Sequence, residues 1–116
     1  MPHIIVECSR SLLSKNFNLR AMLADLHNSI DGIHNVTMDR LKTRAHVTDY
    51  VVVGEQGEKG DMVHINLRLF PGRSDEQKTE LSAILKKVAR DHLLPISSKC
   101  DPTVEVSELH GPSYQY

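Results

Sequence analysis

The chain has 116 residues, a formal net charge of -1 from 14 basic and 15 acidic side chains, and only 4% aromatic residues. A chain of this length forms one domain and can bury a core without disulfides or metals. The balanced charge excludes the basic surface of nucleic-acid or anionic-membrane binding, and the lack of tryptophan argues against base stacking. We therefore expect a single domain over residues 1–116, with no nucleic-acid or membrane partner.

The cellular compartment is predicted from the N-terminal sequence and the cysteines. No apolar run approaches the ~18 residues of a membrane span, and the apolar residues 4–6 are followed at once by Glu7, which is unlike a signal peptide. We therefore expect a cytoplasmic protein. Cys8 and Cys100 have no metal-binding or redox spacing. In a reducing compartment both are expected to stay reduced, with Cys8 in the core and no metal or cofactor.

The first third of the chain predicts a strand and then a helix. Residues 2–8, PHIIVEC, alternate in polarity, and Pro2 stands at a first position where its missing N–H costs nothing. A helix is expected from Asn16 or Asn18, either of which can cap its N-terminus, to Ile30. Its apolar residues recur at helical spacing on one face: Leu19, Met22, Leu23, Leu26 and Ile30.

The middle of the chain predicts two strands. Residues 41–53 form the first, and alternate positions carry three basic or potentially basic side chains: Lys42, Arg44 and His46. The charged segment 54–61 contains three glycines and is most simply the tip of a long hairpin. The cleanest strand pattern follows at 62–70. One of its faces is apolar, and the other carries His64, Asn66 and Arg68.

The last third predicts a long helix and a final strand. The helix runs from Asp75 to about Leu94, begins with a Ser74–Gln77 capping box and ends at Pro95. The final strand occupies about 103–109. Right-handed crossovers place both helices on the same side of the sheet. The expected fold is therefore α+β, with two β-α-β units forming a four-stranded mixed sheet and two helices on one face.

The helices leave the opposite sheet face uncovered. That face is expected to carry Arg44, His64, Asn66 and Arg68. An uncovered face on so small a domain is either solvated or an interface between subunits, and we favour an oligomer.

Several short motifs occur in a fixed order along the chain. They are Met-Pro-His-x-x-Val-Glu-Cys at the start, Arg44-x-His46, Val63-His64, Gly72-Arg73-Ser74 and Glu108-Leu109-His110. Each motif alone is weak, whereas their order and spacing together are fairly specific. Together they resemble the tautomerase superfamily, and within it the family of 5-carboxymethyl-2-hydroxymuconate delta-isomerase, over almost the whole chain.

The resemblance implies a homotrimer of tautomerase-like β-α-β duplications, acting on a small carboxylate substrate in aromatic-compound degradation without a cofactor. By position it implies that Pro2 is the catalytic acid/base, once Met1 has been removed, and that Arg73 binds a substrate carboxylate. The family's second arginine is replaced by Lys42, which offers a point charge and not a bidentate fork. Arg44 is the third cation expected to bind substrate.

The expected chemistry is a proton shift in a 2-hydroxymuconate-type acid, from oxygen to carbon. A secondary amine is too basic for this near neutral pH unless burial or nearby cations lower its pKa, and a shift of two units corresponds to about 2.7 kcal/mol. Two alternatives stay open: a related enol–keto tautomerase, and a non-catalytic trimeric binding protein. The last would follow if Met1 were retained, because the Pro2 nitrogen would then be an amide.

Overall fold

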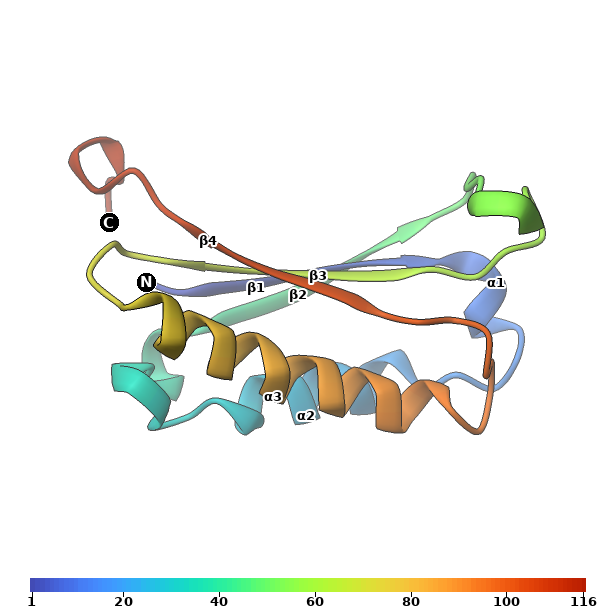
Figure 1. Ribbon diagram of the computed structural model, residues 1–116, viewed down its shortest axis with the longest axis horizontal. Helices are drawn as coiled ribbons and strands as arrows, with labels where there is room; N and C mark the ends of the chain where they lie inside the picture. Colours follow the sequence, from blue (N-terminus) through green and yellow to red (C-terminus); the bar gives the residue numbers. More distant parts are fainter.

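A four-stranded mixed sheet with two helices on one face makes up the fold in the computed structural model, which describes residues 1–116 (Figure 1). The strands are β1 (His3–Ser9), β2 (Lys42–Thr48), β3 (Val63–Leu69) and β4 (Thr103–Glu108). Their order across the sheet is β2-β1-β3-β4. β1 is parallel to β2 and antiparallel to β3, and β4 is parallel to β3. The predicted fold class is therefore confirmed.

The two long helices begin at the predicted caps. In α2 (Leu19–Ser29), the Asn18 side chain accepts a hydrogen bond from the Ala21 N–H at 3.0 Å. In α3 (Asp75–Leu93), Ser74 and Gln77 form the reciprocal capping box. The short elements were not predicted, because a single turn has no periodicity: α1 (Arg10–Leu13), η1 (Ile33–Asn35), η2 (Met38–Arg40), η3 (Gly54–Gln56) and η4 (Gly111–Ser113).

The hydrophobic core lies between the sheet and the two helices. The sheet contributes the even-numbered side chains of β1, including the predicted Cys8, and the odd-numbered side chains of β3. Each helix contributes one apolar stripe: Met22 and Leu26 of the predicted α2 stripe are fully buried, as are Leu81, Leu85 and Ala89 of α3. Each buried leucine-sized side chain contributes about 1.5–3 kcal/mol relative to exposure. The alternation along the strands therefore decides which sheet face the helices cover.

The predicted long hairpin between the second and third strands is wrong. β1 lies between β2 and β3, so these two strands share no hydrogen bonds. The β1-α2-β2 crossover takes one edge of β1, and the other edge is left for β3. β2 also ends at Thr48, and residues 49–62 form an arm that closes on itself through the Val53–Gly57 bridge. The arm returns beside β1, where Met62 O accepts a hydrogen bond from Ser9 N–H at 3.0 Å.

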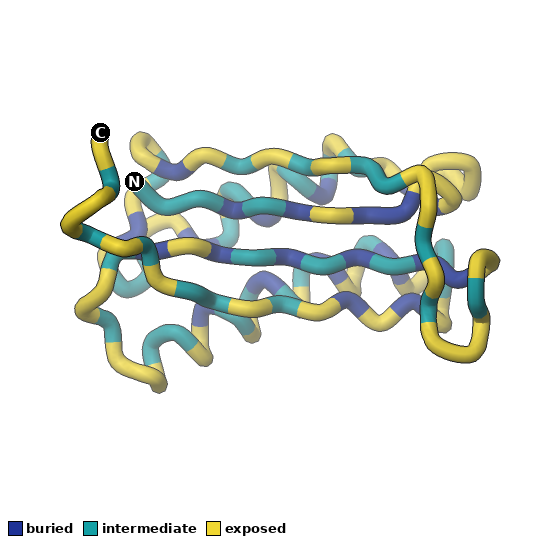
Figure 2. The backbone as a smooth tube through the Cα atoms, turned by 90° about the horizontal axis from the view of Figure 1, so that it is seen from above, coloured by how far each residue is buried: buried dark blue, intermediate teal, exposed yellow.

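The sheet face opposite the helices is uncovered, as predicted (Figure 2). Because side chains alternate between faces, most polar side chains of the four strands fall on this side. They include His3, Glu7, Lys42, Arg44, His46, His64, Asn66, Arg68, Thr103, Glu105 and Ser107. No helix, including the 19-residue α3, is long and apolar enough to cross a membrane.

Asp61 ties three separate segments together at the end of the sheet away from the N-terminus. Its carboxylate is buried and accepts hydrogen bonds from Ser11 and Lys15 beside α1. A third comes from Ser97, after α3, at 2.9 Å. Burial by itself raises the pKa of Asp61, but the three hydrogen bonds outweigh it and hold the pKa below its usual range. The ionised carboxylate is therefore the form that stabilises this corner.

We expect Asp61→Asn to lower the free energy of unfolding by about 2 kcal/mol at pH 7, since charge-assisted hydrogen bonds are lost. A lowered folded-state pKa gives stability that is fully present above the unfolded pKa of about 3.9 and is lost as pH falls through the lower folded-state pKa. Urea unfolding at pH 7 and pH 3 should show the variant and the native chain converging at the acid end.

The matched control for this prediction is Asp49→Asn, because Asp49 pairs with Arg10 while both side chains remain more than half exposed. An exposed pair contributes about 0–1 kcal/mol, so this variant should change stability little. Equal losses in the two variants would contradict the role given to Asp61.

Candidate active site

Pro2 lies at the start of the central strand, so the protein places it inside the sheet and not at an edge. Its carbonyl accepts a hydrogen bond from the Lys42 N–H at 3.1 Å, one step before the His3–Lys42 pair that opens the parallel ladder. The proline ring is half-buried. Proline has no backbone N–H to donate, and at the position before the first strand residue this loses no hydrogen bond of the sheet.

Cations gather around this end of the chain. The terminal amine, here that of Met1, has a pKa below its usual value, first because it is partly buried and then because of Arg40, Lys42 and Arg73. Asp39 acts in the opposite direction. None of the three cations forms a salt bridge with a carboxylate. The terminus therefore sits in a positive field that Asp39 only partly offsets.

A backbone carbonyl in a turn with left-handed residues fixes the position of the Arg73 side chain. Its Nε donates to the His34 carbonyl at 2.9 Å. That carbonyl belongs to a segment where His34 and Asn35 both have positive φ, of 48° and 66°. Gly72, with φ of 126°, precedes Arg73 in the loop from β3 to α3 and permits a backbone course that other residues rarely adopt. The terminal guanidinium nitrogens have no partner and can meet a carboxylate as a fork.

Arg44 points to a different partner from the other two predicted cations. Its Nη1 lies 3.1 Å from His3 Nδ1 on the uncovered face, and it is not among the main charges that lower the pKa of the terminal amine. The His3 pKa is lowered, first by burial and then by Arg44, Lys42, the terminal amine and Arg68. His3 is therefore neutral at neutral pH.

The structure thus brings Lys42 and Arg73 to the Pro2 end and sets Arg44 one step away. Arg40, in η2, is a cation of this cluster that sequence reasoning missed. The sequence feature that could have indicated Arg40 is its position just before the basic strand, two residues before Lys42. That signal is weak, because a short turn gives no periodicity to predict where its side chains point.

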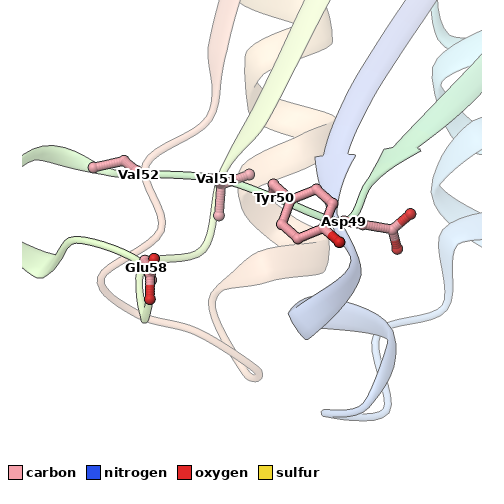
Figure 3. A pocket seen from close by; sticks show the side chains of 5 residues that line it. All are labelled: Asp49, Tyr50, Val51, Val52 and Glu58. Carbon is pink, nitrogen blue, oxygen red and sulfur yellow. The ribbon is translucent and has the colours of Figure 1, made fainter.

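The surface hollows of the single chain lie away from this cluster. One, of about 380 Å³, is at the arm and is lined by Asp49, Tyr50, Val51, Val52 and Glu58 (Figure 3). Its two carboxylates lie apart, and Asp49 is already paired with Arg10. No three His, Cys, Asp or Glu side chains converge to hold a metal. Within one chain the Pro2 cluster is therefore an open surface at the end of the sheet.

The fold, with cations gathered around Pro2 at the start of its central strand, agrees with the class of tautomerase-fold isomerases, and so do comparisons with known proteins. The family model for 5-carboxymethyl-2-hydroxymuconate isomerase matches residues 2–111. The chain belongs to this family, and it is an isomerase.

A protein of similar sequence and solved structures of similar fold accompany this match. The 5-carboxymethyl-2-hydroxymuconate Delta-isomerase of Escherichia coli is 24% identical over 112 residues, covering 95% of this chain and 88% of that protein. Among solved structures, a 5-carboxymethyl-2-hydroxymuconate isomerase from Deinococcus radiodurans R1 has a TM-score of 0.86 at 21% identity, over 99% of this chain and 87% of the other. A structure described as a fused 4-OT symmetric trimer has a TM-score of 0.69 at 18% identity, over 92% and 86%.

The lowered pKa of His3 is testable directly. We expect His3 to titrate below the ordinary histidine value of about 6.5, and we expect Arg44→Met to raise its pKa, because one nearby positive charge is removed. Histidine NMR titration measures both. Arg20→Met, an exposed arginine on α2, is the control and should leave the His3 titration unchanged; an unchanged His3 titration in Arg44→Met would refute the contact.

Proposed function

We propose that the chain, once Met1 is removed, moves a proton within a 2-hydroxymuconate-type unsaturated dicarboxylic or tricarboxylic acid, with the Pro2 nitrogen as acid and base. The family membership supports an isomerase of this class. The observation that carries the proposal is the cluster of Arg40, Lys42 and Arg73, which lies around the chain terminus without carboxylate partners. Three free cations beside one amine suit a substrate with more than one carboxylate.

In the proposed reaction the unprotonated Pro2 nitrogen takes the proton from the 2-hydroxyl oxygen. The electron pair moves through the diene, and the same nitrogen returns the proton to a carbon at the far end of the conjugated system. The product is the 2-oxo tautomer, so no atom is gained or lost. One group acts in both directions, which requires a pKa near the working pH.

Nearby cations would lower the pKa of the Pro2 amine toward the working pH. A unit charge about 6 Å from the nitrogen, at an effective dielectric constant of about 20, contributes about 2.8 kcal/mol, or about two pKa units. The Met1 amine, one residue away, already has a pKa below its usual value, with burial and these charges as the causes. The same charges stabilise the dienolate that forms when the hydroxyl proton leaves.

We further propose that the working form is a homotrimer. The polar sheet face is uncovered in the single chain, and the Pro2 cluster is an open surface with no wall on one side. The neighbouring subunit would supply that wall. Solved structures of similar fold that are described as symmetric trimers support this arrangement.

A second candidate is an enol–keto tautomerase acting on a monocarboxylic acid such as a phenylpyruvate-like compound. The observation that favours it is Lys42, which replaces one arginine fork by a point charge and leaves Arg73 as the predicted fork. A panel of 2-hydroxydienoates and phenylpyruvate-like acids, assayed on Met1-free protein, separates the two. If every acid is inert with a free Pro2, the non-catalytic alternative is favoured.

The role of Pro2 is tested by intact mass measurement and by Pro2→Ala. We expect activity to follow the fraction of chain that lacks Met1, because a Met1-linked Pro2 nitrogen is an amide. General acid–base catalysis contributes about 10²–10⁴-fold, so Pro2→Ala should lower kcat by about 100-fold or more. Comparable turnover in Pro2→Ala, or full activity with Met1 retained, would rule out the proline as the base.

Arg73→Ala should raise KM more than it lowers kcat, because the guanidinium binds a carboxylate that is present in both substrate and transition state. We expect an increase of about tenfold or more, from the loss of a charge-assisted hydrogen-bonded pair. Arg90→Ala is the matched control, since Arg90 is exposed near the other end of α3 and contacts only Asp101. The same change in KM for both variants would contradict a specific role for Arg73.

A further inference from the structure

The C-terminal segment folds back over the uncovered face at the same end as the N-terminus (Figure 1). The Leu109 N–H donates to Leu69 O at 2.7 Å and extends the pairing of β4 with β3. η4 then turns the chain, and the turn is closed by a hydrogen bond from Tyr114 N–H to Gly111 O at 3.2 Å. Tyr114 is thereby carried to the residue that follows Pro2.

Tyr114 contacts two residues that adjoin the proposed site. Its hydroxyl lies 2.7 Å from His3 Nε2. Its ring packs edge to face on Phe70, with ring centres 5.3 Å apart. Phe70 directly follows β3 and begins the loop that leads to Arg73. Tyr116, which is 84% exposed, adds a third ring 5.8 Å from the other two. An aromatic cluster of Phe70, Tyr114 and Tyr116 therefore lies beside His3.

The direction of each hydrogen bond in this group follows from Arg44. A guanidinium can only donate, so His3 Nδ1, 3.1 Å from Arg44 Nη1, is the acceptor. The proton of a neutral His3 must then be on Nε2, which donates it to the Tyr114 oxygen. The tyrosine's own proton is left without a partner in the chain. A hydroxyl that already accepts a hydrogen bond is a stronger donor.

We propose that the Tyr114 hydroxyl is a substrate-binding hydrogen-bond donor, directed at a negatively charged oxygen of the unsaturated acid, and that Arg44 and His3 are positioning residues which orient it. This inference rests on the proposed function for the substrate class. The hydroxyl would add a neutral, directional donor to the charged groups of Lys42 and Arg73.

The purely structural alternative is that Tyr114 only anchors the C-terminus. Anchoring would depend on the ring contact with Phe70 and on the hydrogen bond from His3. The unpartnered proton would have no part in it. Tyr114→Phe keeps the ring and removes the donor, so it separates binding from packing. Tyr116→Phe is the matched control, because that hydroxyl has no hydrogen-bond partner and the ring belongs to the same aromatic cluster.

The test uses Met1-free protein and cis,cis-muconate, an unsaturated dicarboxylate, as the probe in calorimetric titrations. A hydrogen bond to a charged oxygen contributes about 1.5–3 kcal/mol, so Tyr114→Phe should weaken muconate binding about 10-fold or more, and Tyr116→Phe less than twofold. Nitrogen-15 NMR should find His3 protonated at Nε2 and not at Nδ1, and Arg44→Met should mix the two tautomers.

The outcomes separate this inference from the proposed function. Equal muconate binding by the native chain and Tyr114→Phe overturns the Tyr114 role, as does a His3 proton on Nδ1, while turnover on a 2-hydroxydienoate would still support the proposed isomerisation. Weaker binding by Tyr114→Phe without any turnover supports the Tyr114 role and rejects the proposed reaction. Absence of muconate binding to the native chain overturns the Tyr114 role directly.

Discussion

The placement of β1 between a parallel β2 and an antiparallel β3 is the constraint on which the rest of the structure depends. Pro2, the residue before β1, therefore lies between two neighbouring strands at one end of the sheet. On one side the start of β2 brings Lys42 into register with His3. On the other, the end of β3 leads into the loop that carries Arg73. A terminal residue at a sheet edge would have had only one of these neighbours.

The charges at this end are arranged differently from those elsewhere in the chain. Lysines and arginines along α3 pair with acidic side chains, whereas Arg40, Lys42 and Arg73 have no such partner. Like charges held together in a folded protein lower its stability, and nearby carboxylates would relieve the repulsion. A positive cluster that is kept next to a neutral histidine is instead typical of an anion-binding site. The Arg73 anchor to the His34 carbonyl holds one of these charges in place without neutralising it.

The two ends of the sheet differ in how their charged and polar groups are paired. At the far end, Asp61 joins α1, the arm and the segment after α3 through hydrogen bonds to an ionised, buried carboxylate. At the near end, the chain leaves polar groups open, and the C-terminal residues fold over His3. Stability is thus concentrated where no chemistry is proposed, and the exposed, uncompensated groups lie where it is. The polar, uncovered sheet face between the two ends is the surface through which the proposed trimer would complete the site.

Local sequence by itself determined the elements with clear periodicity or caps. The strand alternation at 2–8 and 62–70, the α2 stripe after Asn18 and the Ser74–Gln77 box each depend on neighbours within a few residues, and the order of motifs indicated the family. Tertiary structure alone decided that β1 separates β2 from β3, that Arg40 joins the terminus, that Arg44 meets His3, and that Tyr114 returns to it. These depend on contacts between residues about 40 to more than 100 positions apart. Such contacts leave no periodic signal in the chain, because strand order and side-chain direction are set by packing of the whole sheet.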